Sequence, residues 1–120
     1  MTSDAPWPTE LRLTPEKNEL IVRFDDHSAY ALSAEYLRVT SPSAEVQGHS
    51  EDQRQTVPGK KNVTIAKLEP VGNYAVRIIF DDGHDSGLYS WSYLRELGID
   101  KDSKWRGYLS ELKAKGMSRD

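Results

Sequence analysis

The sequence predicts one α+β domain: a mostly antiparallel β-sheet of five or six short strands, two hairpin-plus-short-helix repeats and a C-terminal helix. Apolar residues alternate in several short runs, aspartate-rich turns join these runs, and serines precede the helix-like segments. A length of 120 residues is typical of one domain. We expect a disordered leader at residues 1–9, the domain at residues 10–98, and a C-terminal helix and tail at residues 99–120.

The first half of the chain predicts a hairpin and a helix. Apolar positions alternate at Leu20, Val22 and Phe24, as in a half-buried strand. Ser33 is a favourable N-cap because its hydroxyl can accept a backbone N–H at a helix start. We predict strands at residues 11–13, 19–24 and 29–32, a turn at 25–28 and a helix at 34–38. The polar residues 40–62 carry no period and are predicted as a long loop.

The second half predicts the same elements again, followed by a longer helix. Asp82-Gly83 is typical of a two-residue type I′ hairpin turn. We predict strands at residues 63–69, 74–80 and 87–89, a turn at 70–73, a helix capped by Ser90 or Ser92 that Gly98 ends, and an amphipathic helix at 104–115.

An internal repeat links the two halves. The segments FDDHS and SAEYLR of the first half match FDDGHDS and SWSYLR of the second. From the phenylalanine to the first serine of the helix segment the second copy is one residue longer, and we expect this extra residue in its turn. Aspartate pairs occur in both copies, which favours turn chemistry over catalysis for them. The second copy adds Gly83, His84, Asp85 and Gly87, so these residues are the candidates for a specific role.

Composition excludes several function classes. The net charge of −3 argues against a nucleic-acid-binding protein. The absence of cysteine excludes disulfides and thiolate metal ligands, and it is consistent with a reducing compartment. No apolar run approaches the ~18 residues of a membrane span, and the acidic N-terminus is unlike a signal peptide. We expect a soluble, cytoplasmic protein with no membrane partner, and no nucleophile motif indicates an enzyme.

Three segments carry a resemblance to a known family: LEPVGNYAVRIIFDDGHDSGLYSWSYLRELG, YLRVTSPSAEVQGH and PGKKNVTI. Together they resemble the gamma-butyrobetaine hydroxylase-like N-terminal domain family, over roughly Leu11 to Gly98. The resemblance implies a small α+β fold around an antiparallel sheet. It also implies an association with 2-oxoglutarate oxygenases of the carnitine pathway or with Mrp/ApbC-type iron–sulfur carriers, to which family members are fused.

The resemblance also implies a metal site that this chain has changed. In the hydroxylases three cysteines and one histidine hold a structural zinc, and by position the histidine matches His84. The cysteine segment falls at Ser41–Val46, where no cysteine stands. If this segment folds back against the second hairpin, His84 and His49 with Glu45 or Asp85 could bind zinc, iron(II) or manganese. The competing interpretation is a turn histidine that bonds a backbone carbonyl or Glu45.

Two main functional hypotheses follow. The first is a non-enzymatic interaction or accessory domain, whose protein partner would be an Mrp/ApbC-type iron–sulfur carrier or an oxygenase. Its docking surface would be the loop at residues 41–50 with the second hairpin, through Asp82, Gly83, His84, Tyr89 and Trp91. The alternative is a metal-binding protein that uses His84 and His49. An uncharacterised enzyme with a site at the same hairpin is a weaker third hypothesis.

Overall fold

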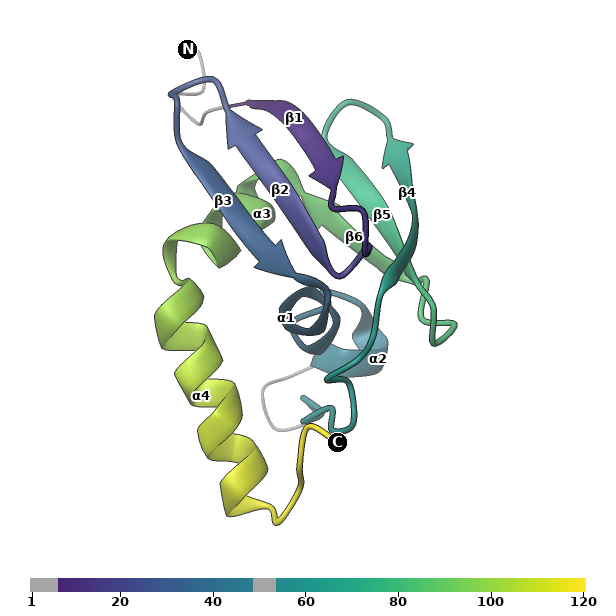
Figure 1. The fold of residues 1–120 in the computed structure, drawn as a ribbon, viewed down its shortest axis with the longest axis vertical. Helices are drawn as coiled ribbons and strands as arrows, with labels where there is room; N and C mark the ends of the chain where they lie inside the picture. Colours follow the sequence, from purple (N-terminus) through teal and green to yellow (C-terminus); the bar gives the residue numbers. More distant parts are fainter. Residues whose placement is uncertain (1–6, 49–53) are drawn as a thin grey trace.

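The fold is built from two β-β-β-α units that follow one another along the chain (Figure 1). The computed structural model describes residues 7–48 and 54–120. The first unit consists of β1 (Pro8–Leu13), β2 (Glu19–Phe24), β3 (Ala29–Ser33) and α1 (Ala34–Val39), and the short α2 (Ala44–Gln47) follows it. The second unit consists of β4 (Ile65–Val71), β5 (Ala75–Phe80), β6 (Gly87–Ser90) and α3 (Trp91–Ile99), and α4 (Lys101–Ala114) comes last. The predicted α+β class is confirmed.

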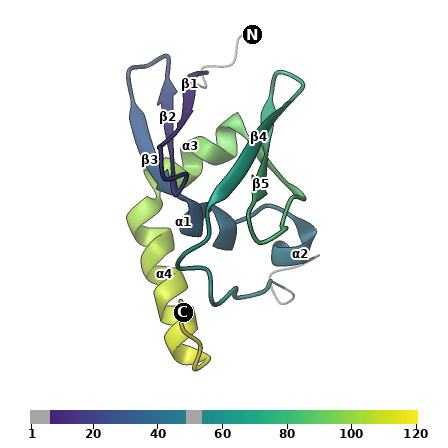
Figure 2. The same ribbon diagram turned by 45° about the vertical axis from the view of Figure 1, so that its right-hand side comes forward.

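Each unit forms its own three-stranded antiparallel sheet, ordered β1-β2-β3 in the first unit and β4-β5-β6 in the second. This corrects the expectation of one sheet with five or six strands. Figure 2 shows the two sheets diverging from a point near α1. The physical reason is that the apolar sides of both sheets pack against a common core, so side chains rather than ladder hydrogen bonds join them.

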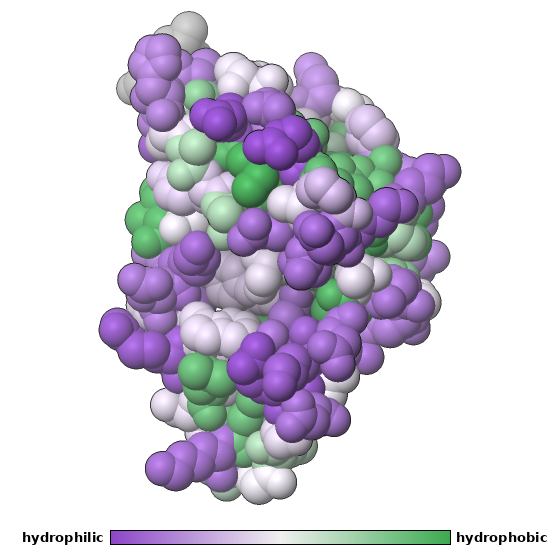
Figure 3. Space-filling view, in the orientation of Figure 1, coloured by the Kyte–Doolittle hydropathy of each residue, from purple (hydrophilic) through white to green (hydrophobic). Residues whose placement is uncertain are grey.

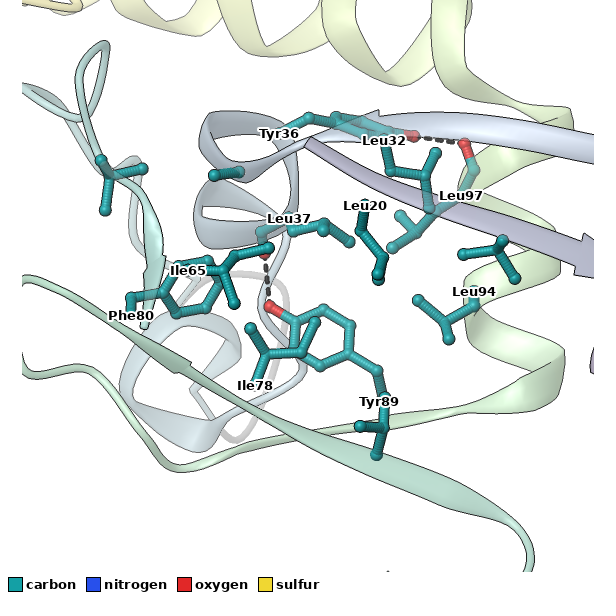
Figure 4. Packing of buried hydrophobic residues seen from close by; sticks show 14 of the residues in the cluster. Leu20, Leu32, Tyr36, Leu37, Ile65, Ile78, Phe80, Tyr89, Leu94 and Leu97 are labelled. Atoms are coloured by element: carbon teal, nitrogen blue, oxygen red, sulfur yellow. Dashed lines mark hydrogen bonds between the residues drawn. The ribbon is translucent and has the colours of Figure 1, made fainter. Parts of the chain in front are cut away.

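The core takes alternate residues from the central strand of each sheet. Leu20, Val22 and Phe24 of β2 and Val76 and Ile78 of β5 are fully or almost fully buried. Two tyrosine hydroxyls also enter this core and donate to backbone carbonyls: Tyr36 to Leu97 at 2.7 Å, and Tyr89 to Leu37 (Figure 4). Buried phenols need such acceptors, and these two fix α1 against α3 and β6.

The hairpin turns of the two units have the same length, which corrects two expectations. Phe24 N–H donates to Ser28 O and His27 N–H to Phe24 O, and the second turn repeats this pattern from Phe80 to His84. The left-handed position is His27 in the first turn, with φ of 73°, and Gly83 in the second, with φ of 90°. These are three-residue turns with a bulge rather than two-residue type I′ turns. The extra residue of the second copy lies after the turn, before β6.

The two units contact each other reciprocally. Arg38 of α1 donates to Asp82 in the second turn at 2.9 Å, and Arg95 of α3 donates to Asp26 in the first turn at 2.6 Å. Both helices start at a serine whose hydroxyl accepts the N–H three residues later, so the predicted cap at Ser33 is confirmed and Ser90, not Ser92, caps α3. Such reciprocity is expected for two copies of one unit related by an approximate twofold axis.

The C-terminal region differs from the prediction at two points. Helix α3 continues through Gly98, where a side chain would lie 2.5 Å from the ring of Tyr30, so this glycine serves close packing rather than helix termination. Helix α4 begins at Lys101, three residues before the predicted start. No helix among the described residues has the length and apolarity of a membrane span.

The N-terminal boundary also lies earlier than expected. Strand β1 begins at Pro8, within the stretch predicted as a leader, because Trp7 and Asp25 exchange backbone and side-chain hydrogen bonds there. Residues 1–6 of that leader lie outside the described part of the chain. The face seen in Figure 3 is largely hydrophilic, with hydrophobic residues in several small areas rather than in one broad patch.

Candidate functional site

The histidine of the second hairpin lies against the polar segment that follows α1. His84 Nε2 is 2.8 Å from Ser41 Oγ, and His84 Nδ1 is 3.0 Å from Glu45 Oε1. Asp82 fixes the backbone at the start of this arrangement in an Asx-type turn, because its Oδ1 accepts the backbone N–H of His84 at 3.0 Å. The expected juxtaposition of the polar segment and the hairpin is therefore confirmed.

Helix α2 positions the groups that meet the histidine. Ser43 caps this helix by accepting the N–H of Glu45 at 3.1 Å, which places the glutamate in the first turn. The Ser43 hydroxyl lies 2.7 Å from the hydroxyl of Ser86, and Ser86 in turn donates to Glu45 at 3.0 Å. Ser41 Oγ also accepts the backbone N–H of Ser43 at 3.2 Å. The site is a connected network between α2 and the second hairpin.

One end of this network is buried and the other is exposed to solvent. Ser41 is 0% and His84 7% exposed, whereas the Glu45 side chain is 68% exposed. Burial lowers the pKa of His84, the charge of Arg38 lowers it further, and Glu45 opposes them. The ring is thus neutral at neutral pH. Because a carboxylate only accepts hydrogen bonds, the proton resides on Nδ1 and Nε2 accepts from Ser41.

A group of charged residues lies beside the histidine. Asp82 accepts from Arg38 at 2.9 Å and pairs with Lys60 at 2.6 Å. Burial opposes ionisation of Asp82, yet hydrogen bonds from Lys60, from the His84 N–H and from Arg38 lower its pKa to about 2. Arg38 Nη1 is buried and has no hydrogen-bond partner within residues 7–48 and 54–120.

The repeat explains this unpaired nitrogen. In the first unit Arg95 Nη1 donates to the hydroxyl of Ser28, which directly follows the left-handed turn residue. The equivalent position in the second unit is His84. Its ring turns toward Ser41 and Glu45, so Arg38 loses the acceptor that Arg95 keeps.

The geometry does not support hydrolytic chemistry. Ser41, His84 and Glu45 are connected in the order of a serine–histidine–carboxylate triad. The serine hydroxyl of such a triad must meet a substrate, but Ser41 is fully buried. A side chain at Gly87 would lie 2.6 Å from Ser41 Oγ, so the space around this hydroxyl is already filled.

The residues present also do not fit the zinc site that the family resemblance implies. A structural zinc needs about four ligands, usually thiolates and imidazoles. Ser41 and Ser43 offer only hydroxyls, and these already form hydrogen bonds, Ser41 with His84 and Ser43 with Ser86. The described residues contain no group of three or more histidine, cysteine, aspartate or glutamate side chains that could hold a metal ion. Asp85 therefore does not join His84 and Glu45 in a ligand set, and His49 lies outside the described residues.

The residues expected to bind a partner are split between surface and core. Asp82 and Gly83 are exposed at the hairpin tip. Tyr89 is fully buried, so it belongs to the core and cannot contact a partner. Trp91 follows β6 at the end remote from the turn, where its indole N–H donates to Asn73 O at 2.8 Å. The surface near His84 is instead completed by Glu45 of α2.

Three contributors to the site were not singled out from sequence. Ser41 and Ser86 lie 43 and two residues from His84, and serine is too common for its type alone to mark a site. Lys60 belongs to no recognisable motif, yet it pairs with Asp82. The matching Tyr-Leu-Arg segments were the available signal for Arg38, since each arginine meets the turn of the other unit.

Comparisons with known proteins agree with the resemblance. The family model for gamma-butyrobetaine hydroxylase-like N-terminal domains matches residues 11–95. Two proteins with NMR solution structures are 47% and 48% identical, with a TM-score of 0.83 each, covering 96% and 99% of this chain and 90% of theirs. A crystal structure of a protein of unknown function, a DUF971 family member from Acidithiobacillus ferrooxidans ATCC 23270, is 36% identical with a TM-score of 0.64, covering 76% of this chain and 91% of that one.

No curated protein matches this chain. The family match spans both β-β-β-α units up to the Tyr-Leu-Arg segment of α3, and it includes Ser41, Glu45 and His84. The chain therefore belongs to the gamma-butyrobetaine hydroxylase-like N-terminal domain family, a family with structurally characterised members of unknown function.

Proposed function

We propose that this protein is a non-enzymatic accessory domain that docks a protein partner through the surface around His84. The supporting observation is that the chemically active groups of the site are already engaged with one another, while the carboxylates at its rim face solvent. Both ring nitrogens of His84 have hydrogen-bond partners, and Ser41 is buried. A site with saturated inner groups is suited to holding a surface in shape rather than to turnover.

The rim of this surface is acidic. Asp81 and Asp85 are exposed on the second hairpin, and the Glu45 side chain is exposed on α2. Acidic rims steer basic partners and set the specificity of docking more than its strength. We therefore infer a partner with a basic contact surface.

The family resemblance suggests the class of this partner protein. Relatives of this domain are fused to Mrp/ApbC-type iron–sulfur carriers or precede 2-oxoglutarate oxygenases, and we propose that this domain acts on such a carrier in the cytoplasm. The oxygenase is the second choice, because the zinc-binding cysteines of that branch are absent here. No nucleic-acid or membrane partner is proposed, in keeping with the net charge of −3.

The test uses the purified carrier and an untagged chain. We expect a 1:1 complex in isothermal titration calorimetry, weakened at least tenfold by Glu45→Lys and by Asp85→Lys, with affinity that falls as salt rises. Glu16→Lys, an exposed substitution in the first unit, is the matched control and should leave binding unchanged. Equal binding by all three variants would place the docking surface elsewhere, and no binding to carrier or oxygenase would remove the proposed partners.

The metal-binding alternative is tested on the same material. Elemental analysis of the untagged chain would have to show near-stoichiometric zinc or iron that is lost in His84→Ala to support it. Among the described residues no specific geometry favours this alternative.

A further inference from the structure

The segment after α4 runs back across the first unit and pairs with a loop far away in sequence. Helix α4 ends in a turn in which Gly116 has φ of 66° and Met117 N–H donates to Leu112 O at 2.8 Å. The chain then reaches the loop before β4 (Figure 1). Gly59 N–H donates to Ser118 O and Lys61 N–H to Arg119 O, both at 3.0 Å. These bonds resemble those by which an extended peptide adds to an exposed backbone edge.

The same segment inserts a guanidinium into a buried acidic pocket. Glu35 of α1 has a side chain that is 7% exposed, and both its oxygens accept from Arg119, at 2.7 and 2.8 Å. The guanidinium carbon also lies 5.3 Å from the ring centroid of Trp105. A buried carboxylate below and an aromatic face beside a planar fork are the features that select arginine over lysine.

The pocket and its occupant come from different parts of the chain. Glu35 and the Gly59–Lys61 loop lie within the family match at residues 11–95, whereas Trp105 of α4 and the occupant Arg119 lie outside it. A cavity of about 440 Å³ lies on the side of the Gly59–Lys61 loop and is lined in part by Lys60, Asp82 and Arg119, so the Arg119 side chain can be reached from solvent there. Two backbone bonds, the Arg119 side chain and one exposed Lys61–Asp120 ion pair are a small contact for a peptide segment, and a separate arginine-bearing strand can compete with it.

We propose that Glu35, Trp105 and the Gly59–Lys61 edge form a recognition site for an arginine in an extended segment of a partner protein, and that Arg119 occupies this site until the partner displaces it. The site is distinct from the surface around His84. The two sites adjoin at the Lys60–Asp82 pair, but the variants that test them change different residues, Arg119 and Glu35 here and Glu45 and Asp85 there, so either proposal can fail without the other.

The first test asks whether the pocket takes a guanidinium from solution. The probe is N-acetyl-arginine methylamide, added to the full chain carrying Arg119→Ala, with binding followed by the indole N–H signal of Trp105 in ¹H–¹⁵N spectra. We expect saturable shifts in this variant, at least tenfold weaker binding of N-acetyl-lysine methylamide, and at least tenfold weaker binding of the arginine probe to the unmodified chain. Adding Glu35→Gln to the variant should abolish the shifts.

A second variant covers the case in which Arg119→Ala does not fold. Arg119→Lys keeps a cation beside Glu35, and the arginine probe should displace this lysine more readily than it displaces the native arginine. A peptide with the sequence Ser-Arg-Asp should then bind better than the single amino acid, because it also offers carbonyls to Gly59 and Lys61. A folded variant that ignores the arginine probe, binds arginine and lysine probes equally, or binds as weakly as the unmodified chain would overturn the proposal.

Discussion

Removing the hydroxyl of Ser41 is the sharpest test of the site, since this buried group bonds the buried nitrogen of His84. In Ser41→Ala, His84 Nε2 loses a partner at 2.8 Å and the N–H of Ser43 loses one at 3.2 Å. A buried polar group left unpaired costs about 1–3 kcal/mol. Two such losses predict a decrease in the free energy of unfolding of roughly 2–6 kcal/mol, a large part of the ~5–15 kcal/mol typical of a domain.

The matched control is Ser86→Ala, in the same network but at its solvent-exposed end. Ser86 bonds Glu45, whose side chain is 68% exposed, and the hydroxyl of Ser43, which keeps the Glu45 N–H as a partner, so water can replace the lost hydroxyl. We expect a change below about 1 kcal/mol. Urea denaturation followed by tryptophan fluorescence measures both variants, and equal m-values would show that only native-state stability changed. Equal losses in the two variants, or a loss below about 0.5 kcal/mol in Ser41→Ala, would refute the argument from burial.

Three further predictions concern the histidine, its charged neighbours and the turns. Burial lowers the folded-state pKa of His84 below 6.5, so the unfolded chain takes up more protons than the folded chain as pH falls below 6.5. The free energy of unfolding should therefore decrease in this range, and less steeply in His84→Gln. Urea midpoints measured as a function of pH check this. Asp82→Ala should cost about 2–3 kcal/mol in the same assay, because Arg38, only 12% exposed, loses its carboxylate; a neutral result would contradict the pairing. Gly83→Ala should cost about 1–2 kcal/mol, because its new methyl group meets nothing within 4 Å and only the strain of the left-handed backbone remains. His27→Gly should relieve the same strain in the first turn and raise the melting temperature, and calorimetry compares the two variants.

Local patterns were sufficient to predict most elements of the fold. Strands β2 and β5 follow from alternating apolar residues, and the cap at Ser33 follows from a bond between neighbours in sequence. What local patterns could not show was tertiary packing. Gly98 looked like a helix end, but it lies inside α3 because the ring of Tyr30 occupies the space of a side chain. The separation into two sheets likewise depends on contacts between strands that are distant in the chain.

The candidate site was only partly predictable. The pairing of His84 with Glu45 followed from residue types and from the family resemblance, which places this histidine near the segment after α1. The role of Ser41 could not be predicted, because it depends on a distance between residues 43 positions apart. Helix α2 has only four residues, too few to give a helical period in a polar stretch. The prediction that Tyr89 belongs to the docking surface was wrong, because strand alternation alone does not say which face is covered.

The internal repeat offers a way to separate scaffold from specific chemistry in this domain. Contacts that occur in both units, such as the arginine–aspartate pairs, are required by the packing of one unit on the other. The site around His84 occurs only once: Ser28 stands at the equivalent place in the first unit and satisfies Arg95. Making the second unit like the first, with His84→Ser, should therefore give Arg38 Nη1 a hydroxyl partner and leave Ser41 and Glu45 without theirs. If the surface around His84 docks a partner, this variant should fold and lose binding to the carrier. Retained binding would show that the histidine only fills the space between the second hairpin and the segment after α1.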